Sequence, residues 1–193
     1  MAARADRRIV LIRHGQTEWS ATDRHTGRTD IDLTTVGEEQ AAALAPTIAS
    51  LGLADPYVIC SPRHRTQRTA QLAGLTVDET SDLFAEWDYG DYEGLTRVEI
   101  HERHDPDWLV WTGGGPGGES VQAMSDRVDR AVAHVLAASD GDLVVVSHGH
   151  FSRAFIARFL GTPIGFGAHI AFAAAGYAVL DEVDGHRLRR LAE

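Results

Sequence analysis

Three short apolar runs, rich in β-branched and aliphatic residues, constrain the fold of this chain more than any other feature. They span residues 9–12, 57–60 and 143–146. Continuous apolar runs of this length are typical of strands that are covered on both faces in a parallel sheet. Each run is followed by a small polar turn and then by a helical pattern, which favours alternation of strands and helices. The sequence therefore predicts an α/β fold, a three-layer sandwich in which helices cover both faces of a mostly parallel central sheet.

Further local signals mark two of the helices and a late hairpin. Thr35 and Glu38 have the spacing of a capping box at a helix start, and Pro46 is expected to kink or split that helix. The clearest helix follows Ser120, because valine and methionine side chains recur there on one face. Asp-Gly at residues 184–185 separates two strand-like segments, which indicates a β-hairpin. We therefore expect an antiparallel element late in the chain.

Composition limits the classes of partner. The 193 residues are 44% hydrophobic, which suits one domain over residues 1–193 with a core of its own. The 28 acidic residues outnumber the 18 lysines and arginines and give a net charge of −10, so nucleic acid and anionic membranes are disfavoured as partners. A small anionic ligand stays open, because a pocket can be locally positive on an acidic protein.

The single cysteine and the shortness of the apolar runs indicate a compartment. Cys60 excludes an internal disulfide, and its simplest interpretation is a small buried side chain at a strand end. The apolar run at residues 9–12 is too short for a signal-peptide core or a membrane span. We therefore expect a soluble cytoplasmic protein, and the sequence leaves a homo-oligomer open.

Polar residues follow all three predicted strands at the point where each strand ends. Arg13, His14 and Gly15 follow the first, Ser-Pro-Arg-His-Arg at residues 61–65 the second, and Ser-His-Gly-His at residues 147–150 the third. Ligands in open α/β sheets bind beyond the carboxyl ends of the strands. A phosphate dianion needs cationic donors and a nucleophile in line with its ester oxygen. One strand-end histidine is usually structural, but repetition at three strand ends indicates a phosphate-binding site.

Several longer motifs occur together along the chain. They are Arg-His-Gly-Gln-Thr-Glu-Trp at residues 13–19, His-Thr-Gly-Arg-Thr-Asp at 25–30 with Leu-Thr at 33–34, the segment 61–70, Glu-Trp-Asp-Tyr-Gly at 86–90 with Tyr-Glu-Gly at 92–94, Gly-Glu-Ser at 118–120 and Ser-His-Gly at 147–149. With these motifs the chain resembles the histidine phosphatase superfamily, in its phosphoglycerate mutase-like branch. The residues within these motifs most resemble those of broad-specificity acid phosphatases and sedoheptulose-bisphosphatase-like enzymes.

The resemblance assigns the catalytic roles. It implies that His14 is the nucleophile, that Arg13 and Arg65 bind the phosphate, and that His148 is a second phosphate-binding histidine. Glu86 matches the family's proton donor. Nearby arginines disfavour a charged imidazole, so we expect the pKa of His14 to be held down. His148, if protonated, would add a further charged donor.

A second group of residues is expected to bind the substrate. Ser20 stands where mutases usually carry a phosphate-binding asparagine, and the remaining members of the group are Thr26, Gly27, Tyr89 and Gly149. Helices that begin near Gly15 and Gly149 would direct N–H groups toward the phosphate. The glycine-rich residues 113–118 are expected to form a mobile loop that could serve as a lid.

The histidine pairs of this chain do not indicate a metal site. His101 with His104 and His148 with His150 could each supply two ligands, but no cysteine or carboxylate cluster has metal spacing, and nearby arginines would repel a cation. We therefore expect no metal and no cofactor. His150 receives no role from the sequence.

The function predicted from these residues is a metal-independent phosphatase that hydrolyses small phosphate monoesters, such as sugar phosphates, through a phosphohistidine intermediate. Its partner would be a small phosphorylated metabolite. A cofactor-dependent phosphoglycerate mutase and a phospho-ligand binding protein without catalysis are the alternatives. Between Glu86 and Gly118, only Arg97 and Arg103 are lysines or arginines, and they lie among several carboxylates. A second anion would be poorly held by this segment, which favours water as the phosphoryl acceptor.

Overall fold

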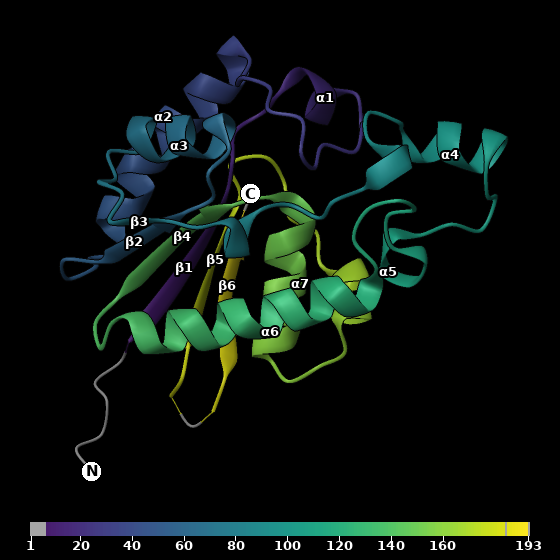
Figure 1. The fold of residues 1–193 in the computed structure, drawn as a ribbon. Coiled ribbons are helices and arrows are strands. Elements are labelled where there is room, and N and C mark those ends of the chain that lie inside the picture. The colour runs from purple at the N-terminus through teal and green to yellow at the C-terminus, as the bar shows by residue number, and fades with distance from the viewer. Residues whose placement is uncertain (1–6, 184, 193) are drawn as a thin grey trace.

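In the computed structural model, which describes residues 7–183 and 185–192, the described strands form one six-stranded sheet in the order β3-β2-β4-β1-β5-β6 (Figure 1). The strands are β1 (Arg8–Arg13), β2 (Tyr57–Cys60), β3 (Glu79–Thr80), β4 (Leu143–Ser147), β5 (Tyr177–Asp181) and β6 (Arg187–Ala192). The first four strands pair in parallel, whereas β5 is antiparallel to both β1 and β6. The predicted mostly parallel sheet with a late antiparallel element is therefore confirmed.

Helices cover both faces of this sheet, as predicted. The α-helices are α1 (Glu18–Ala21), α2 (Thr35–Ser50), α3 (His64–Leu72), α4 (Arg97–Arg103), α5 (Val110–Gly113), α6 (Val121–Ala138) and α7 (Gly149–Phe159), and short 3₁₀ helices are η1 (Asp82–Phe84), η2 (Gly90–Tyr92) and η3 (Ile164–His169). Helices α2 and α3 pack on one face, and α6 and α7 on the other (Figure 1). None of the described helices has the length and apolar character needed to cross a membrane.

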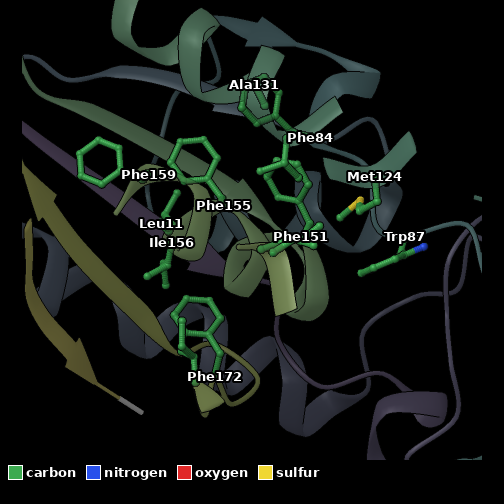
Figure 2. Packing of buried hydrophobic residues seen from close by; sticks show 14 of the residues in the cluster. Leu11, Phe84, Trp87, Met124, Ala131, Phe151, Phe155, Ile156, Phe159 and Phe172 are labelled. Atoms are coloured by element: carbon green, nitrogen blue, oxygen red, sulfur yellow. The ribbon is translucent and has the colours of Figure 1, made fainter. Parts of the chain in front are cut away.

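Alternation along the strands explains the two apolar layers. In β1, Ile9 and Leu11 join the core cluster under α6 and α7, whereas Val10 and Ile12 join the cluster under α2 and α3. The larger cluster contains the phenylalanines of α7, which lie beside Leu11 and Ile156 in Figure 2. Burying one such aromatic or aliphatic side chain stabilises a fold by about 1.5–3 kcal/mol. The continuous apolar runs are therefore strands that are buried on both faces.

Helix α2 differs from the sequence-based expectation in two details. The N-cap is Thr34, whose hydroxyl accepts from the N–H of Gly37 at 3.0 Å, so the capping box expected of Thr35 and Glu38 is wrong by one residue. Pro46 lies inside the helix and does not split it. Its ring removes the hydrogen bond to the carbonyl four residues earlier, but both positions are exposed, so water can satisfy that carbonyl.

The other two local predictions are confirmed where the structure describes them. Ser120 is the N-cap of α6, and the valine and methionine face of that helix is buried. Strands β5 and β6 form the antiparallel pair, with Tyr177 opposite Ala192 and Asp181 opposite Arg187. Asp184 of the predicted turn lies outside the described residues.

The glycine-rich residues 113–118 pack against the segment that follows Glu86, and their role as a lid stays a prediction. The N–H of Asp91 donates to the carbonyl of Pro116 at 2.7 Å. A Cβ on Gly90 would lie 2.0 Å from that same carbonyl oxygen, and the φ of Gly90 is +56°. Only glycine permits such a close backbone approach. The loop therefore supports the segment that carries the predicted proton donor.

Candidate active site

The carboxyl ends of β1 and β4 bring the two predicted histidines together. These strands pair in parallel with Arg13 opposite Ser147, and the N–H of His14 donates to the carbonyl of Ser147 at 3.0 Å. The imidazole rings of His14 and His148 lie 5.3 Å apart, centroid to centroid, at an angle of 68°. The convergence predicted from the strand ends is confirmed.

A cavity of about 210 Å³ lies over His14. It is small compared with the roughly 300–1,000 Å³ of clefts for drug-sized ligands, so it has room only for a small molecule or for part of a larger one. Seven of the ten predicted site residues line it, and the whole lining is Arg13, His14, Ser20, Asp23, Arg24, His25, Thr26, Glu86, Tyr89, Gly149, His150, Arg153 and Phe172. Of the predicted residues, Gly27, Arg65 and His148 are not part of this wall.

His14 is buried and neutral. Its Nδ1 lies 2.7 Å from the carbonyl oxygen of Gly15. A carbonyl can only accept, so Nδ1 carries the ring proton and Nε2 keeps its lone pair. Burial, followed by the charges of Arg65 and Arg13, holds the pKa of His14 well below its ordinary value. The predicted direction is confirmed, although burial is a larger cause than the arginines.

Arg13 lies against the start of α7. Its Nη1 donates to the carbonyl of Phe172 at 2.6 Å, while its Nε is buried without a partner among the described residues. A Cβ on Gly149 would lie 3.2 Å from Cζ and Nε of Arg13, so the glycine leaves room for the guanidinium. Gly149 therefore shapes the site by having no side chain.

Arg65 is fully buried behind the cavity. Its Nη1 donates to the carbonyl of Thr29 at 2.8 Å, and its Nη2 donates to the carbonyls of Thr26 and Gly27 at 3.1 and 3.2 Å. The third nitrogen, Nε, is buried without a partner among the described residues. The loop at residues 26–29 thus fixes the guanidinium plane.

Gly27 contributes to this loop and not to the cavity wall. Its N–H donates to the carboxylate of Glu93 at 2.8 Å, and a Cβ at this position would lie 2.4 Å from the carbonyl oxygen of Trp87. The structure therefore places Gly27 where it supports Arg65, instead of where it could touch a substrate.

His148 is sealed from solvent between Ser61 and the start of α7. The hydroxyl of Ser61 lies 2.7 Å from its Nε2, and its Nδ1 is buried without a partner among the described residues. Burial, then the charges of Arg65 and His14, lowers its pKa well below the ordinary value. This direction favours the neutral ring, so the further charged donor that a protonated His148 would supply is not favoured here.

Glu86 caps helix α7. Its Oε1 accepts from the N–H groups of Trp87 at 2.9 Å and Phe151 at 2.8 Å, and its Oε2 accepts from the N–H of His150 at 3.0 Å. Helix α7 begins at Gly149 as predicted, but these two N–H groups of its first turn bind the carboxylate and are not directed to an anion. Burial and N–H donors thus fix the carboxylate at the cavity wall.

The prediction that a helix begins near Gly15 is wrong. No helix begins near Gly15, because α1 starts at Glu18 and Gly15 donates its N–H to the hydroxyl of Thr69 at 3.1 Å. Ser20 lies in α1, where its hydroxyl accepts from the N–H of Thr17 at 2.8 Å and also contacts the carbonyl of Thr17. Ser20 lines the cavity as predicted, with its hydroxyl used in the local capping box.

Sequence reasoning missed several residues of the wall, and the most informative are His150, His25 and Arg153. The Nδ1 of His150 lies 2.7 Å from the hydroxyl of Tyr89, and its ring stacks on His25 with centroids 6.0 Å apart. Burial is the main cause of a lowered pKa at both histidines and of a raised pKa at Tyr89. Arg153 lies one turn after Gly149 on α7. A helix that starts at a strand end places residue i+4 on the same side, and this spacing was the available signal.

The histidine pairs do not form a metal centre. Among residues 7–183 and 185–192, no group of three or more histidine, cysteine, aspartate or glutamate side chains is arranged to hold a metal ion. His101 directs its Nε2 to the carbonyl of Trp108 at 2.8 Å, and His104 packs on Tyr92. Both histidines therefore have structural contacts.

Comparison with known proteins gives consistent results. Residues 9–192 match the family model described as histidine phosphatase superfamily (branch 1). An acid phosphatase of Mycobacterium tuberculosis is 50% identical over 186 residues, covering 96% of this chain and 90% of that protein. A sedoheptulose 1,7-bisphosphatase of Saccharomyces cerevisiae is 34% identical, covering 80% of this chain and 68% of that protein. A solved structure of an open reading frame product from Mycobacterium tuberculosis has a TM-score of 0.93 and 49% identity, covering 96% of this chain and 97% of that one.

Proposed function

Because the chain belongs to the histidine phosphatase superfamily, we propose that it is a metal-independent phosphatase that hydrolyses small phosphate monoesters through a phosphohistidine at His14. One observation carries the proposal. Around the neutral His14, three nitrogens are buried without a partner among the described residues, namely Arg13 Nε, Arg65 Nε and His148 Nδ1. Buried donors are rarely left unpaired, and a water molecule, an ion or a ligand completes most of them. These three nitrogens differ from the other unpartnered atoms because they surround one histidine. Oxygens of a phosphate supply the missing acceptors.

The first chemical step transfers the phosphoryl group to the protein. Nε2 of His14 attacks phosphorus with its lone pair, and the bond from phosphorus to the ester oxygen breaks. Arg13 and Arg65 stabilise charge on the non-bridging oxygens. His148 can donate from Nδ1 while neutral, because its Nε2 can accept from the hydroxyl of Ser61 at 2.7 Å. Glu86 gives a proton to the departing oxygen.

The second step returns the protein to its starting state. A water molecule attacks the phosphohistidine, Glu86 takes its proton, and His14 leaves with its lone pair restored. The Oε2 atom of Glu86 accepts one N–H bond, against two at Oε1, and so has the freer lone pair for both proton transfers. Water is the principal acceptor in this proposal.

The substrate class follows from the cavity and the relatives. A cavity of about 210 Å³ with polar and charged walls suits a small metabolite such as a sugar phosphate. The names acid phosphatase and sedoheptulose 1,7-bisphosphatase support hydrolysis of phosphate esters. We further propose that residues 1–193 form one domain and that the protein acts in the cytoplasm, where a single free cysteine such as Cys60 is expected to stay reduced.

The test is to quench the protein during turnover of a substrate labelled at its phosphate, in the presence of a chelator. We expect an acid-labile, base-stable phosphoenzyme in wild type and in the control His134→Ala, which alters a histidine on α6 that is paired with Glu79. His14→Ala should trap no label, turn over no substrate and keep its fold, since His14 ends a strand outside the apolar core. In wild type and in His134→Ala, the trapped label should then be released as inorganic phosphate. Turnover by folded His14→Ala, inactivation by the chelator, or transfer of label mainly to a second metabolite hydroxyl would contradict the proposal.

A further inference from the structure

Arg153 is an arginine at the cavity wall that the proposed phosphate chemistry does not use. It lies on α7, where its Nε donates to the carbonyl of Gly167 at 2.8 Å and its Nη2 donates to the carbonyl of Ala168 at 3.3 Å. Its guanidinium carbon lies 5.0 Å from the ring centroid of Trp111. The buried indole and two carbonyls of η3 therefore hold the guanidinium plane in place before any ligand binds.

One nitrogen of the Arg153 guanidinium is still able to donate hydrogen bonds to a ligand. Its Nη1 makes no hydrogen bond to any residue in the described part of the chain, and none of the described carboxylates forms an ion pair with it. A guanidinium keeps its charge even when it is partly buried. The carboxylates of Asp23 and Glu86 line the same cavity, but neither forms an ion pair with Arg153, so this positioned cation can still attract an anion.

The neighbouring arginines do not offer the same site. Arg24 also lines the cavity, but its Nη1 donates to the carbonyl of Gly94 at 2.7 Å and to the carboxylate of Glu99 at 2.9 Å. Arg28 pairs with Asp88 and is 76% exposed, and it is not part of the wall. Arg153 is thus the cation at this wall that is neither paired with a carboxylate nor assigned to the reacting phosphate.

We propose that Arg153 binds a second anionic group of the substrate, so that the preferred substrates are small phosphate monoesters that also carry a carboxylate or another phosphate. The inference rests on the proposed phosphatase function. It revises the expectation that a second anion would be poorly held, because that expectation considered the segment between Glu86 and Gly118 and not α7.

Helix geometry limits the distance between the two anions. The guanidinium of Arg13 lies close to Gly149, since a Cβ on this glycine would be 3.2 Å from Cζ of Arg13, and Arg153 follows four residues later on the same helix. At 1.5 Å per residue, four residues advance the helix by about 6 Å. Two anionic groups separated by a chain of a few carbon atoms match this spacing and the size of the cavity.

The experiment compares three substrates. Glycerol 3-phosphate and 3-phosphoglycerate have the same number of carbons, but only the second carries a carboxylate, and fructose 1,6-bisphosphate carries a second phosphate. We expect wild type to have a higher kcat/KM for at least one of the doubly anionic compounds than for glycerol 3-phosphate. Arg153→Met should lower that preference by about 10- to 100-fold, the range for a lost hydrogen bond to a charged group. Loss with only one compound identifies the second anion as carboxylate or phosphate.

Two further variants sharpen the result. Arg153→Lys keeps the charge without the planar fork and should retain part of the preference. Arg158→Met, on the same helix, removes an exposed ion pair to Asp129 and should leave all three kcat/KM values unchanged. Should Arg153→Met fail to fold, Arg153→Gln makes the same comparison, because its amide can donate to the carbonyl of Gly167 without a charge.

Equal losses with all three substrates, or an unchanged preference, would overturn the second-anion site. In either case the phosphohistidine would still be trapped from glycerol 3-phosphate, so the proposed function would stand. Failure to trap a phosphoenzyme from any of the three compounds is instead a failure of the proposed function.

Discussion

The two ends of the cavity are built in different ways. At the phosphate end, His14 and His148 follow directly from paired parallel strands, and Arg65 lies in the first turn of α3. At the leaving-group end, Tyr89 comes from an irregular segment and Arg153 from the second turn of α7. The first end is therefore fixed by sheet register, while the second depends on how loops and aromatic side chains pack.

The two ends also differ in how far their buried polar groups are hydrogen-bonded within the protein. Buried nitrogens at the phosphate end lack partners among the described residues, as at Arg13 and Arg65. At the leaving-group end Tyr89 is bonded to His150 and Trp111 packs against the guanidinium of Arg153, although Nη1 of Arg153 has no hydrogen-bond partner among the described residues. We infer that the phosphate end is built for one chemistry, whereas the other end can be repacked for different substrates.

Replacement of Glu86 should give the largest contrast. Glu86→Gln removes the proposed proton donor, so kcat/KM for alkyl phosphates should fall by about 10²–10⁴-fold. Aryl phosphates with good leaving groups need less protonation and should lose much less. The rate to measure is that of phosphoenzyme formation, by rapid quench, because Glu86 is also proposed to act in hydrolysis of the phosphohistidine. Similar losses for alkyl and aryl substrates would mean that Glu86 does not protonate the leaving group.

Replacement of Arg65 should give a loss that does not depend on the leaving group. Arg65→Met removes a donor to the non-bridging oxygens, and kcat/KM should fall by about 10²–10³-fold for alkyl and aryl phosphates alike. The pKa of His14 should rise, because the second cause of its depression is gone, and the acid limb of the pH–rate profile should move to higher pH.

Arg68→Met is the matched control for this variant. Arg68 lies on the same helix, where it is partly exposed and pairs with Glu38 at 2.8 Å. Its loss should change neither kcat/KM nor the acid limb of the pH–rate profile, since surface ion pairs contribute little to stability. A leaving-group-dependent loss in Arg65→Met would erase the distinction between the two ends.

The smallest expected effect is on stability: acid should lower the free energy of unfolding by a small amount for each buried histidine. His14, His25, His148 and His150 all have lowered pKa values. The unfolded chain takes up protons at these histidines near pH 6.5 while the folded chain does not, so the free energy of unfolding decreases as pH falls below that value. Each fully depressed histidine costs about 1 kcal/mol at pH 5.5, or roughly 2–4 °C in Tm.

Thermal unfolding between pH 7.5 and 5.5 checks this sign. Wild type should lose several degrees, and His148→Gln should show a shallower slope from its own Tm at pH 7.5. Asp142 and Asp181, whose pKa values are lowered, lose their contribution only as pH falls below about 4, outside this window. A flat Tm in wild type, or an unchanged slope in the variant, would contradict the neutral buried state of the histidines.

What the sequence could predict follows this division. The sheet, the approach of His14 to His148 and the place of Glu86 at the cavity wall could be predicted, because strand ends and family motifs mark positions along the chain. For Arg153 the i+4 spacing from Gly149 indicated the side of α7 on which it lies, but its fixed place at the wall also depends on the packing of Trp111, which the sequence does not show. The capping of α7 by Glu86 was also hidden, since the two segments lie 64 residues apart.

The close contact of Gly90 with Pro116 has a consequence for how this protein can vary. Backbone contacts with residues 116–118 help to hold the segment that follows Glu86. Substitutions at Tyr89 or Arg153 can then change which metabolite fits while the acid stays where it is. We expect libraries randomised at these two positions to yield new specificities far more often than libraries that replace Gly90.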